Sequence, residues 1–411
     1  MRLGKIKIGN GISVFVMLSL IVLLFQNSLA NIVNVFNYYD EIFTIIIVLL
    51  AIYRATQKKY HINRANMSMY FLIAVVGIIG NFLSNINLSA FIIIVDLFSV
   101  LKVFIAFDFM SDFLSEREKK CIVEAISGIF RIYILIAMFF LFVGLALNIN
   151  VLFTQQRYGM RSYSFIRENA GNFGYLIMGI TCFISMDSVH KKKNFPYIVM
   201  GLILCVTTLK GPQIIFSAIY VSFYLLHTKK IKPYHLVIAA IIVVFLGQYQ
   251  IRNYIFNETS ARYNLIAAAA KITKDYFPIG AGFGSFGSEM SRQFYSPLYH
   301  KYGISNVYGL SESYNSYIND NYWPMIFAQF GIVVGIVVLI RFVRLFFLIN
   351  KKKEEPRIKW IILACYITML IGSLGSAYLT SSVGVICFMA IGLYNNKEGL
   401  ISDKFKQSKQ R

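Results

Sequence analysis

Residues 88–107 read LSAFIIIVDLFSVLKVFIAF, an apolar run whose only charged residues are Asp96 and Lys102. A run of about 20 apolar residues has the length of a helix that crosses the hydrocarbon core of a bilayer. Similar runs recur along the chain: hydrophobic residues make up 57% of its 411 residues, charged residues only 14%, and the mean hydropathy is +0.62. Because soluble domains carry roughly 25% charged residues, the composition excludes a soluble protein and predicts an all-α polytopic membrane protein.

The apolar runs predict about twelve transmembrane helices. They lie at 12–30, 37–53, 67–86, 88–107, 121–148, 170–187, 195–208, 212–227, 234–250, 322–346, 358–378 and 380–395. The short runs 195–208 and 212–227 leave two arrangements open, a tight hairpin and a re-entrant pair. The chain is thereby divided into a membrane domain of nine helices (1–250), a large loop between helices 9 and 10 (251–321), a membrane domain of three helices (322–396) and a basic tail (397–411).

The basic residues predict which side of the membrane each connection faces. With the N-terminus in the cytoplasm, 28 of the 40 Lys and Arg residues fall in cytoplasmic connections and 10 in outer ones. Cytoplasmic connections of membrane proteins carry this excess. We therefore expect a protein of the cytoplasmic (inner) membrane with both termini in the cytoplasm and the large loop outside. The net charge of +21 then reflects topology and contact with head groups of the lipid bilayer, and no nucleic-acid partner is expected.

Arginines in the outer connection 150–169 run against this distribution. Arg157, Arg161 and Arg167 lie there, in a connection short enough for the positive-inside rule to apply. Arginine presents a planar fork of donors that suits phosphate groups. The pattern favours an anionic outer substrate such as a lipid-linked pyrophosphate; contact with outer-leaflet phospholipid head groups is the alternative. The large loop, where the rule is weaker, adds Arg252, Arg262 and Arg292.

The large loop contains a glycine-rich turn and many tyrosines. Residues 282–287 read GFGSFG and match GxGxxG, but a dinucleotide site needs a strand before this pattern and a helix after it. Gly282 and Gly284 indicate either a turn beneath a sugar or phosphate or a simple flexible turn. Tyrosine rings such as Tyr295 and Tyr314 suit stacking on sugars and equally suit the membrane interface. No cofactor and no metal are expected, because no Cys-His cluster has metal-ligand spacing.

Asp320 lies directly before the tenth predicted helix. It is a candidate general base, and an acid at this position can also cap the helix N-terminus. Glu289 and His300 are further outer groups able to exchange protons. Within the spans, ionisable groups such as Asp96 and Lys102 are expected to be either functional or part of buried pairs. Lys102 lies late in its helix, so its ammonium can also extend toward the cytoplasmic interface.

Four segments share a pattern in a fixed order. Residues 157–173 place Arg-Tyr-Gly ahead of an Asn-Ala-Gly-Asn-Phe, residues 207–212 read TTLKGP, residues 278–286 read PIGAGFGSF, and residues 320–335 begin Asp-Asn-Tyr and end GIVVG. Together with one dominant outer loop and about twelve helices, they resemble the O-antigen ligase/polymerase superfamily, and most closely the Wzy-type polymerases of bacterial surface polysaccharide. The likeness in architecture extends over nearly the whole chain.

The matches to this family also show departures. Lys210 stands where the family's TLSRG segment has arginine, and Asp320 stands where the ligases have histidine. Arg292 and Gly303 fit the Arg-x10-Gly signature of the polymerase loops, whereas Arg161 and Gly171 in the first loop are one residue short of it. Which first-loop arginine has the family's role therefore stays open.

The resemblance implies a C-type glycosyltransferase fold and a metal-independent polymerase. Such an enzyme joins undecaprenyl-diphosphate-linked oligosaccharide repeat units into O-antigen or capsule on the outer face of the membrane. Its partners would be the lipid-linked oligosaccharide, with a chain-length regulator and a flippase of the same pathway. The residues assigned to this chemistry are Arg157, Arg161, Lys210 and Arg292 for the diphosphate, Asp320 as base with Glu289 behind it, and Gly282, Gly284, Tyr295 and Tyr314 for the glycan.

Two other functions stay open. An O-antigen ligase shares the fold and the donor but transfers the glycan to lipid A core, and Asp320 in place of histidine argues mildly against it. A lipid-linked oligosaccharide flippase or transporter predicts short outer loops and a charged path through both halves of the protein. The long loop and the outer arginines argue against that function.

Overall fold

The computed structural model describes residues 11–57, 63–86, 88–167, 169–227, 257–351 and 355–395. Most of these residues are helical, as expected for apolar segments that must satisfy their backbone hydrogen bonds without water. The first part contains α1 (Gly11–Ala30), η1 (Asn34–Tyr38), α2 (Tyr39–Thr56), α3 (Arg64–Ser84), α4 (Ala90–Asp108), the π-helical η2 (Phe109–Phe113), α5 (Glu116–Ala146) and η3 (Asn150–Leu152). Then follow β1 (Phe153–Arg157), β2 (Met160–Tyr163), α6 (Ala170–Met186), α7 (Lys191–Thr207) and α8 (Gly211–His227). The last part contains α10 (Ala261–Asp275), α11 (Glu289–Gln293), α12 (Pro297–Lys301), α13 (Tyr322–Asn350), α14 (Pro356–Ser373), η4 (Tyr378–Thr380) and α15 (Ser382–Tyr394).

The apolar runs of the sequence form helices wherever the structure describes them. Among the described residues, seven helices are long and apolar enough to cross a membrane, and α6, α8 and α15 are shorter apolar helices. The predicted helix 234–250 and the basic tail lie outside the described residues. The two short runs that the sequence left open form α7 and α8, which pack against each other across a turn at 208–210. The chain is thus a helical, membrane-spanning protein, and the number of crossings stays a prediction.

The centre of the helix bundle is formed by two of its shortest apolar helices. Every residue of α15 is buried, and so are nearly all residues of α6. A helix that is apolar on all sides is stable among other helices or in lipid, and α6 and α15 are covered by other helices. The longer helices around this pair leave large apolar side chains exposed, such as Phe82 on α3, Phe142 on α5 and Val343 on α13. These outer faces fit contact with lipid.

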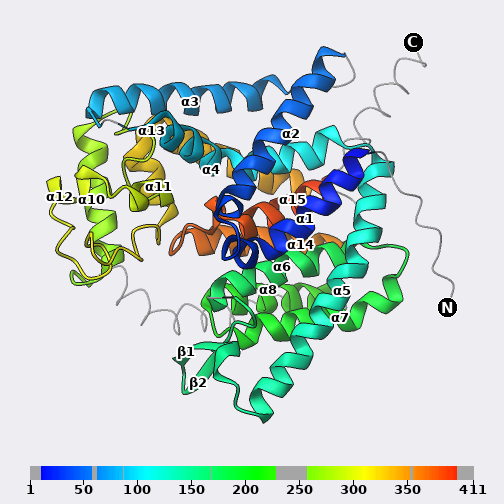
Figure 1. Cartoon of the computed structure of the whole chain (residues 1–411). Helices are drawn as coiled ribbons and strands as arrows, with labels where there is room; N and C mark the ends of the chain where they lie inside the picture. Colours follow the sequence, from blue (N-terminus) through cyan, green and yellow to red (C-terminus); the bar gives the residue numbers. More distant parts are fainter. Residues whose placement is uncertain are drawn as a thin grey trace.

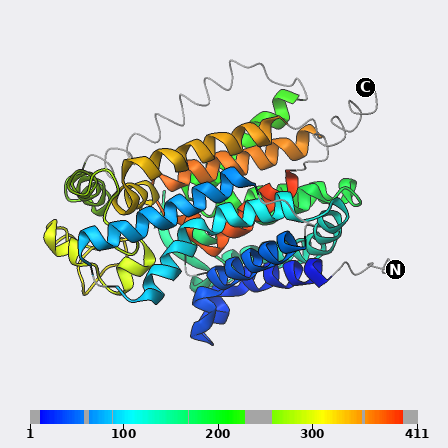
Figure 2. The same ribbon diagram turned by 90° about the horizontal axis from the view of Figure 1, so that it is seen from above.

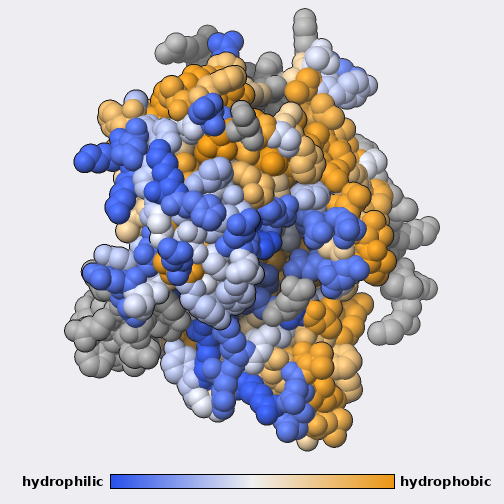
Figure 3. All heavy atoms as spheres, turned by 60° about the vertical axis from the view of Figure 1, so that its left-hand side comes forward, coloured by the Kyte–Doolittle hydropathy of each residue, from blue (hydrophilic) through white to orange (hydrophobic). Residues whose placement is uncertain are grey.

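The large loop folds into a small unit at one end of the bundle, called here the loop end (Figures 1 and 2). Its helices α10, α11 and α12 surround a separate hydrophobic core that includes Leu265, Phe286 and Tyr299. Helix α10 packs on α13, and α11 packs on α4. Hydrophilic residues gather on the face that this unit covers, and hydrophobic residues flank them (Figure 3).

The predicted first outer connection adds a short β-hairpin, which the sequence did not predict, to the otherwise helical described residues. Strands β1 and β2 form an antiparallel hairpin in which Arg157 pairs with Met160. The two residues between them, Tyr158 and Gly159, both have positive φ angles, of 52° and 75°. Two such residues form a type I′ turn, whose twist matches that of the adjoining strands. This hairpin lies at the end of α5 and before α6, and it determines where Arg157 and Arg161 lie.

The two ends of the described chain lie together, opposite the loop end (Figure 2). Ile12 on α1 shares a cavity with Arg54 and Phe113. At the C-terminal end, the side-chain amide of Asn395 donates to the Ser111 hydroxyl, 2.8 Å away. The structure therefore brings both ends to one side, and which side of the membrane this is remains a prediction.

Candidate functional site

A polar cavity opens at the loop end of the bundle. It has a volume of about 390 Å³ and is lined by residues from α1, α2, α4 and α11, and by the turn that leads into α15. Small-molecule sites are commonly ~300–1,000 Å³. Charged groups this deep in an apolar bundle are costly unless they are paired, so their partners indicate what the cavity can hold.

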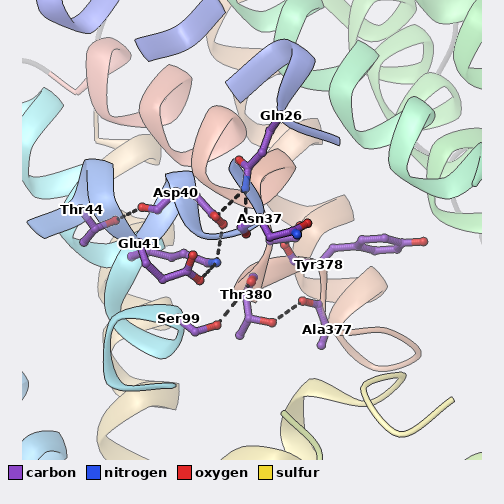
Figure 4. A network of polar contacts seen from close by, with 11 residues as sticks. Gln26, Asn37, Asp40, Glu41, Thr44, Ser99, Ala377, Tyr378 and Thr380 are labelled. Carbon is purple, nitrogen blue, oxygen red and sulfur yellow. Dashed lines mark hydrogen bonds and ion pairs between the residues drawn. The ribbon is translucent and has the colours of Figure 1, made fainter. Parts of the chain in front are cut away.

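Lys102 lies on the wall of this cavity and bonds two carboxylates of α2. Figure 4 shows these carboxylates, on Asp40 and Glu41, beside Gln26. Lys102 is 1% exposed, and its ammonium donates to Asp40 and to Glu41, the latter over 2.6 Å. The side-chain amide of Gln26 donates to Asp40 over 2.8 Å. Lys102 therefore forms buried ion pairs, one of the roles that the sequence left open for it, rather than extending along its helix to a membrane interface. The carboxylates at the start of α2 draw its ammonium toward the loop end, because a buried ammonium needs charged partners.

The cavity rim carries an ion pair within α11. The Nε of Arg292 donates to Oε2 of Glu289 over 2.9 Å, and a second donor of the same guanidinium bonds Oε1. The amide of Asn319 also donates to Glu289 Oε2, over 2.9 Å. Asn315 accepts from the remaining arm of Arg292 at 3.3 Å. The fork of Arg292, which the sequence assigned to a diphosphate, thus faces a carboxylate of its own helix.

A second polar cluster surrounds Asp320. Arg262 on α10 lies 3.3 Å from the Asp320 carboxylate. Burial, together with the charges of Arg157 and Arg262, lowers the pKa of Lys210 to about 8, and Asp320 opposes this change. Burial raises the pKa of Asp320 above its ordinary value, while Arg262 and Lys210 lower it. Arg262 and Lys210 therefore act on the Asp320 carboxylate, and Arg157 lies close enough to act on Lys210.

The capping role considered for Asp320 is not found. The residue at the N-cap of α13 is Asn321, and its side chain makes no capping hydrogen bond. The Asp320 carboxylate instead bonds Arg262. The sequence pattern Asn-Asp-Asn before an apolar run is typical of a cap, but the guanidinium on α10 binds the carboxylate in its place.

The cavity and the Asp320 cluster adjoin each other. Asn319, which bonds Glu289 at the rim, directly precedes Asp320. On the other side, Thr380 lines the cavity, while Tyr378 lies close to the second cluster. Burial and the charge of Asp320 raise the pKa of Tyr378 to about 12, although Arg262 lowers it. One ligand can therefore reach both places.

The glycine-rich turn has a structural place in the protein. Gly282 and Gly284 have φ angles of +90° and +63° and are buried. The side chain of Asn81 on α3 donates to the carbonyl of Phe283 over 2.8 Å and accepts from its N–H over 3.0 Å. Asp96 on α4 accepts from the N–H of Gly284 over 2.6 Å. The turn thus anchors the loop to α3 and α4 and holds α11 at the cavity rim.

The other predicted site residues lie apart from both clusters. Tyr295 is 9% exposed in the core of the loop, and its hydroxyl donates to the carbonyl of Leu310. Tyr314 is 43% exposed and contacts Tyr308 in a tilted ring pair on the loop surface. Arg161 lies exposed on β2, where it donates to the side chain of Asn148 over 2.8 Å. Of the two tyrosines predicted to bind sugar, only Tyr314 is exposed.

Several residues of the two clusters were not assigned to the site from the sequence. Asp40 and Glu41 stand at the start of α2, where acids commonly complement the helix dipole. Their position therefore looks ordinary, and only the nearness of Lys102 shows their part in the cavity. Arg262 is visible in the sequence as an outer basic residue, but no local pattern links it to Asp320.

Within the described ranges, no group of three or more His, Cys, Asp or Glu side chains is placed to hold a metal ion. No family model matches the chain, and no curated protein matches it either.

Proposed function

We propose that this protein is a membrane polymerase that joins polyprenyl-diphosphate-linked oligosaccharide repeat units into a surface polysaccharide. The observation that carries the proposal is the cluster at the loop end in which Arg262 bonds Asp320, and Lys210 lies near Asp320, Arg262 and Arg157. With the lysine protonated, this cluster carries two more positive than negative charges, which suits a diphosphate. The resemblance of the sequence to Wzy-type polymerases supports the same chemistry.

The roles follow from the charges and contacts. Arg157, Lys210 and Arg262 bind the diphosphate and stabilise the charge that develops on it as it leaves. Asp320 accepts the proton of the attacking hydroxyl, since burial raises its pKa. The guanidinium of Arg292 bonds the carboxylate of Glu289 and so positions that carboxylate at the cavity rim.

The reaction breaks one bond and forms one. A hydroxyl of the acceptor sugar attacks the anomeric carbon of the donor, and the bond from that carbon to the diphosphate oxygen breaks. The lipid diphosphate leaves with the bonding electron pair, and the hydroxyl proton passes to Asp320. Electrostatic stabilisation of the leaving diphosphate contributes more in a partly buried site than in water.

The purified full-length protein and lipid-linked repeat units test this function, with the ladder of polymer lengths as the readout. Asp320→Asn keeps a partner for Arg262 but removes the base, and we expect the rate to fall about 10²–10⁴-fold. Asp275→Asn is the matched control, because Asp275 is an exposed acid of the same loop that bonds only Tyr302 in the described structure. Wild-type rates for Asp320→Asn would remove Asp320 from the mechanism.

A deletion strain distinguishes the alternatives. Lipid-linked single repeats without long chains support the polymerase. Long chains left on the lipid diphosphate would instead indicate a ligase, and repeats accumulating toward the cytoplasm would indicate a flippase.

A further inference from the structure

The cavity at the loop end is balanced in charge. Three cationic and three anionic side chains line it, namely Lys102, Arg167, Arg292, Asp40, Glu41 and Glu289. Lys102 bonds both acids of α2, and Arg292 bonds Glu289 through two donors. A site with no net charge has little attraction for a diphosphate, in contrast to the Asp320 cluster beside it.

The remaining lining of the cavity is rich in uncharged hydrogen-bonding groups. Side-chain amides come from four elements, with Gln26 and Asn27 on α1, Asn37 on η1, Asn172 on α6 and Gln293 on α11. Amides offer both donors and acceptors, and hydroxyls of Ser99 and Thr380 add to them. Such a lining matches a neutral ligand that carries many hydroxyl groups.

We infer that this cavity binds one or two sugar residues of the lipid-linked oligosaccharide, while the diphosphate of that lipid binds at the Asp320 cluster. The inference rests on the proposed function and assigns its substrate to two adjoining subsites. The two subsites are close together, because Asn319 bonds Glu289 at the cavity rim and the next residue in the chain is Asp320. The ion pairs of Lys102 and Arg292 hold the carboxylate oxygens and the basic N–H groups of the cavity in place. Sugar hydroxyls would therefore bind to a preorganised set of donors and acceptors.

Asn37 and Asn172 provide the test. Both line the cavity without being buried, so that truncation to alanine does not open a hole in the core. Asn306→Ala is the matched control, since Asn306 is exposed in the large loop and lies outside the lining. Thermal unfolding of all three variants in nanodiscs is expected to match that of the wild-type protein.

Two probes separate the subsites. One is the repeat-unit oligosaccharide, released from its lipid diphosphate by mild acid; the other is polyprenyl diphosphate without sugar. Asn37→Ala and Asn172→Ala are each expected to weaken oligosaccharide binding roughly twofold to tenfold, the effect of one lost hydrogen bond, and to leave lipid-diphosphate binding unchanged. Lys210→Gln is expected to do the reverse. In turnover, the two alanine variants should raise KM for the lipid-linked repeat by the same factor, with kcat unchanged.

The outcomes distinguish the two proposals. One outcome is that the wild-type protein forms polymer while both alanine variants match its oligosaccharide affinity and its KM for the lipid-linked repeat. In that case the sugar subsite lies elsewhere and the polymerase proposal stands. If the wild-type protein binds neither probe and forms no polymer, the polymerase proposal fails, and the sugar subsite fails with it.

Discussion

Replacing Lys210 with arginine is expected to flatten the pH dependence of polyprenyl-diphosphate binding. Lys210 lies in the turn between α7 and α8, where burial and the charges of Arg157 and Arg262 lower its pKa from 10.5 to about 8. Only the protonated amine attracts an anion. An arginine at the same position keeps its charge throughout the range in which this lysine titrates.

The magnitude follows from this pKa. An amine with a pKa of about 8 is roughly 90% protonated at about pH 7 and roughly 10% protonated at about pH 9. Binding through the charged form therefore weakens about tenfold between these two pH values. The sign is set by linkage: a bound diphosphate favours the protonated amine, so binding takes up a proton above about pH 8 and is opposed by rising pH.

Titration of polyprenyl diphosphate into the full-length protein in nanodiscs, from about pH 6 to about pH 9.5, measures this effect. The wild-type protein should lose affinity above about pH 8, Lys210→Arg should hold its affinity, and Lys210→Gln should be weak and flat. The ionisation of the lipid itself is common to all three proteins and cancels in their ratios. A wild-type profile parallel to that of Lys210→Arg would refute the assignment of Lys210 to the diphosphate.

Three further changes test the architecture around the site. Gly282→Ala places a Cβ against the backbone of α3 and should lower the melting temperature well below that of the control Gly303→Ala. At Gly303 the space around the Cβ is open, and only the positive φ costs ~1–2 kcal/mol. Equal melting temperatures would mean that the turn is not anchored. Lys102→Met leaves two buried carboxylates without their cation and should cost about 3–5 kcal/mol of stability. Thermal unfolding measures this loss, and unchanged stability would show that the carboxylates are neutral. Ser313→Cys lies exposed in the large loop, and in a background lacking Cys121 an impermeant thiol reagent should label it in intact spheroplasts; labelling only after the membrane is broken would reverse the predicted topology.

Local patterns in the sequence were sufficient to predict the apolar helices among the described residues, but not the helices α10, α11 and α12 of the large loop. An apolar run of bilayer length has no water to satisfy its backbone groups, so a helix is the one regular structure that a single segment can form there. The runs 12–30, 322–346 and 380–395 accordingly form α1, α13 and α15 with small shifts of their boundaries. The hairpin at 153–163 was missed, because two short strands in a connection carry little periodicity and its Tyr158–Gly159 turn is an isolated signal.

The pairing of side chains was decided by the tertiary structure. Lys102 meets Asp40 across 62 positions of the chain, and Gly284 meets Asp96 across 188. Asp40 at a helix start and Gly284 in a turn look ordinary beside their neighbours in sequence. Asp96 and Lys102 stand out as charged residues within a span, but their partners do not. Their partners depend on which helix faces lie together, and that arrangement follows from packing α6 and α15 at the centre of the bundle and docking the loop on α3, α4 and α13. The sequence could therefore name the residue types of a diphosphate site, but only the packed structure places Arg262 on Asp320 and turns the fork of Arg292 toward Glu289.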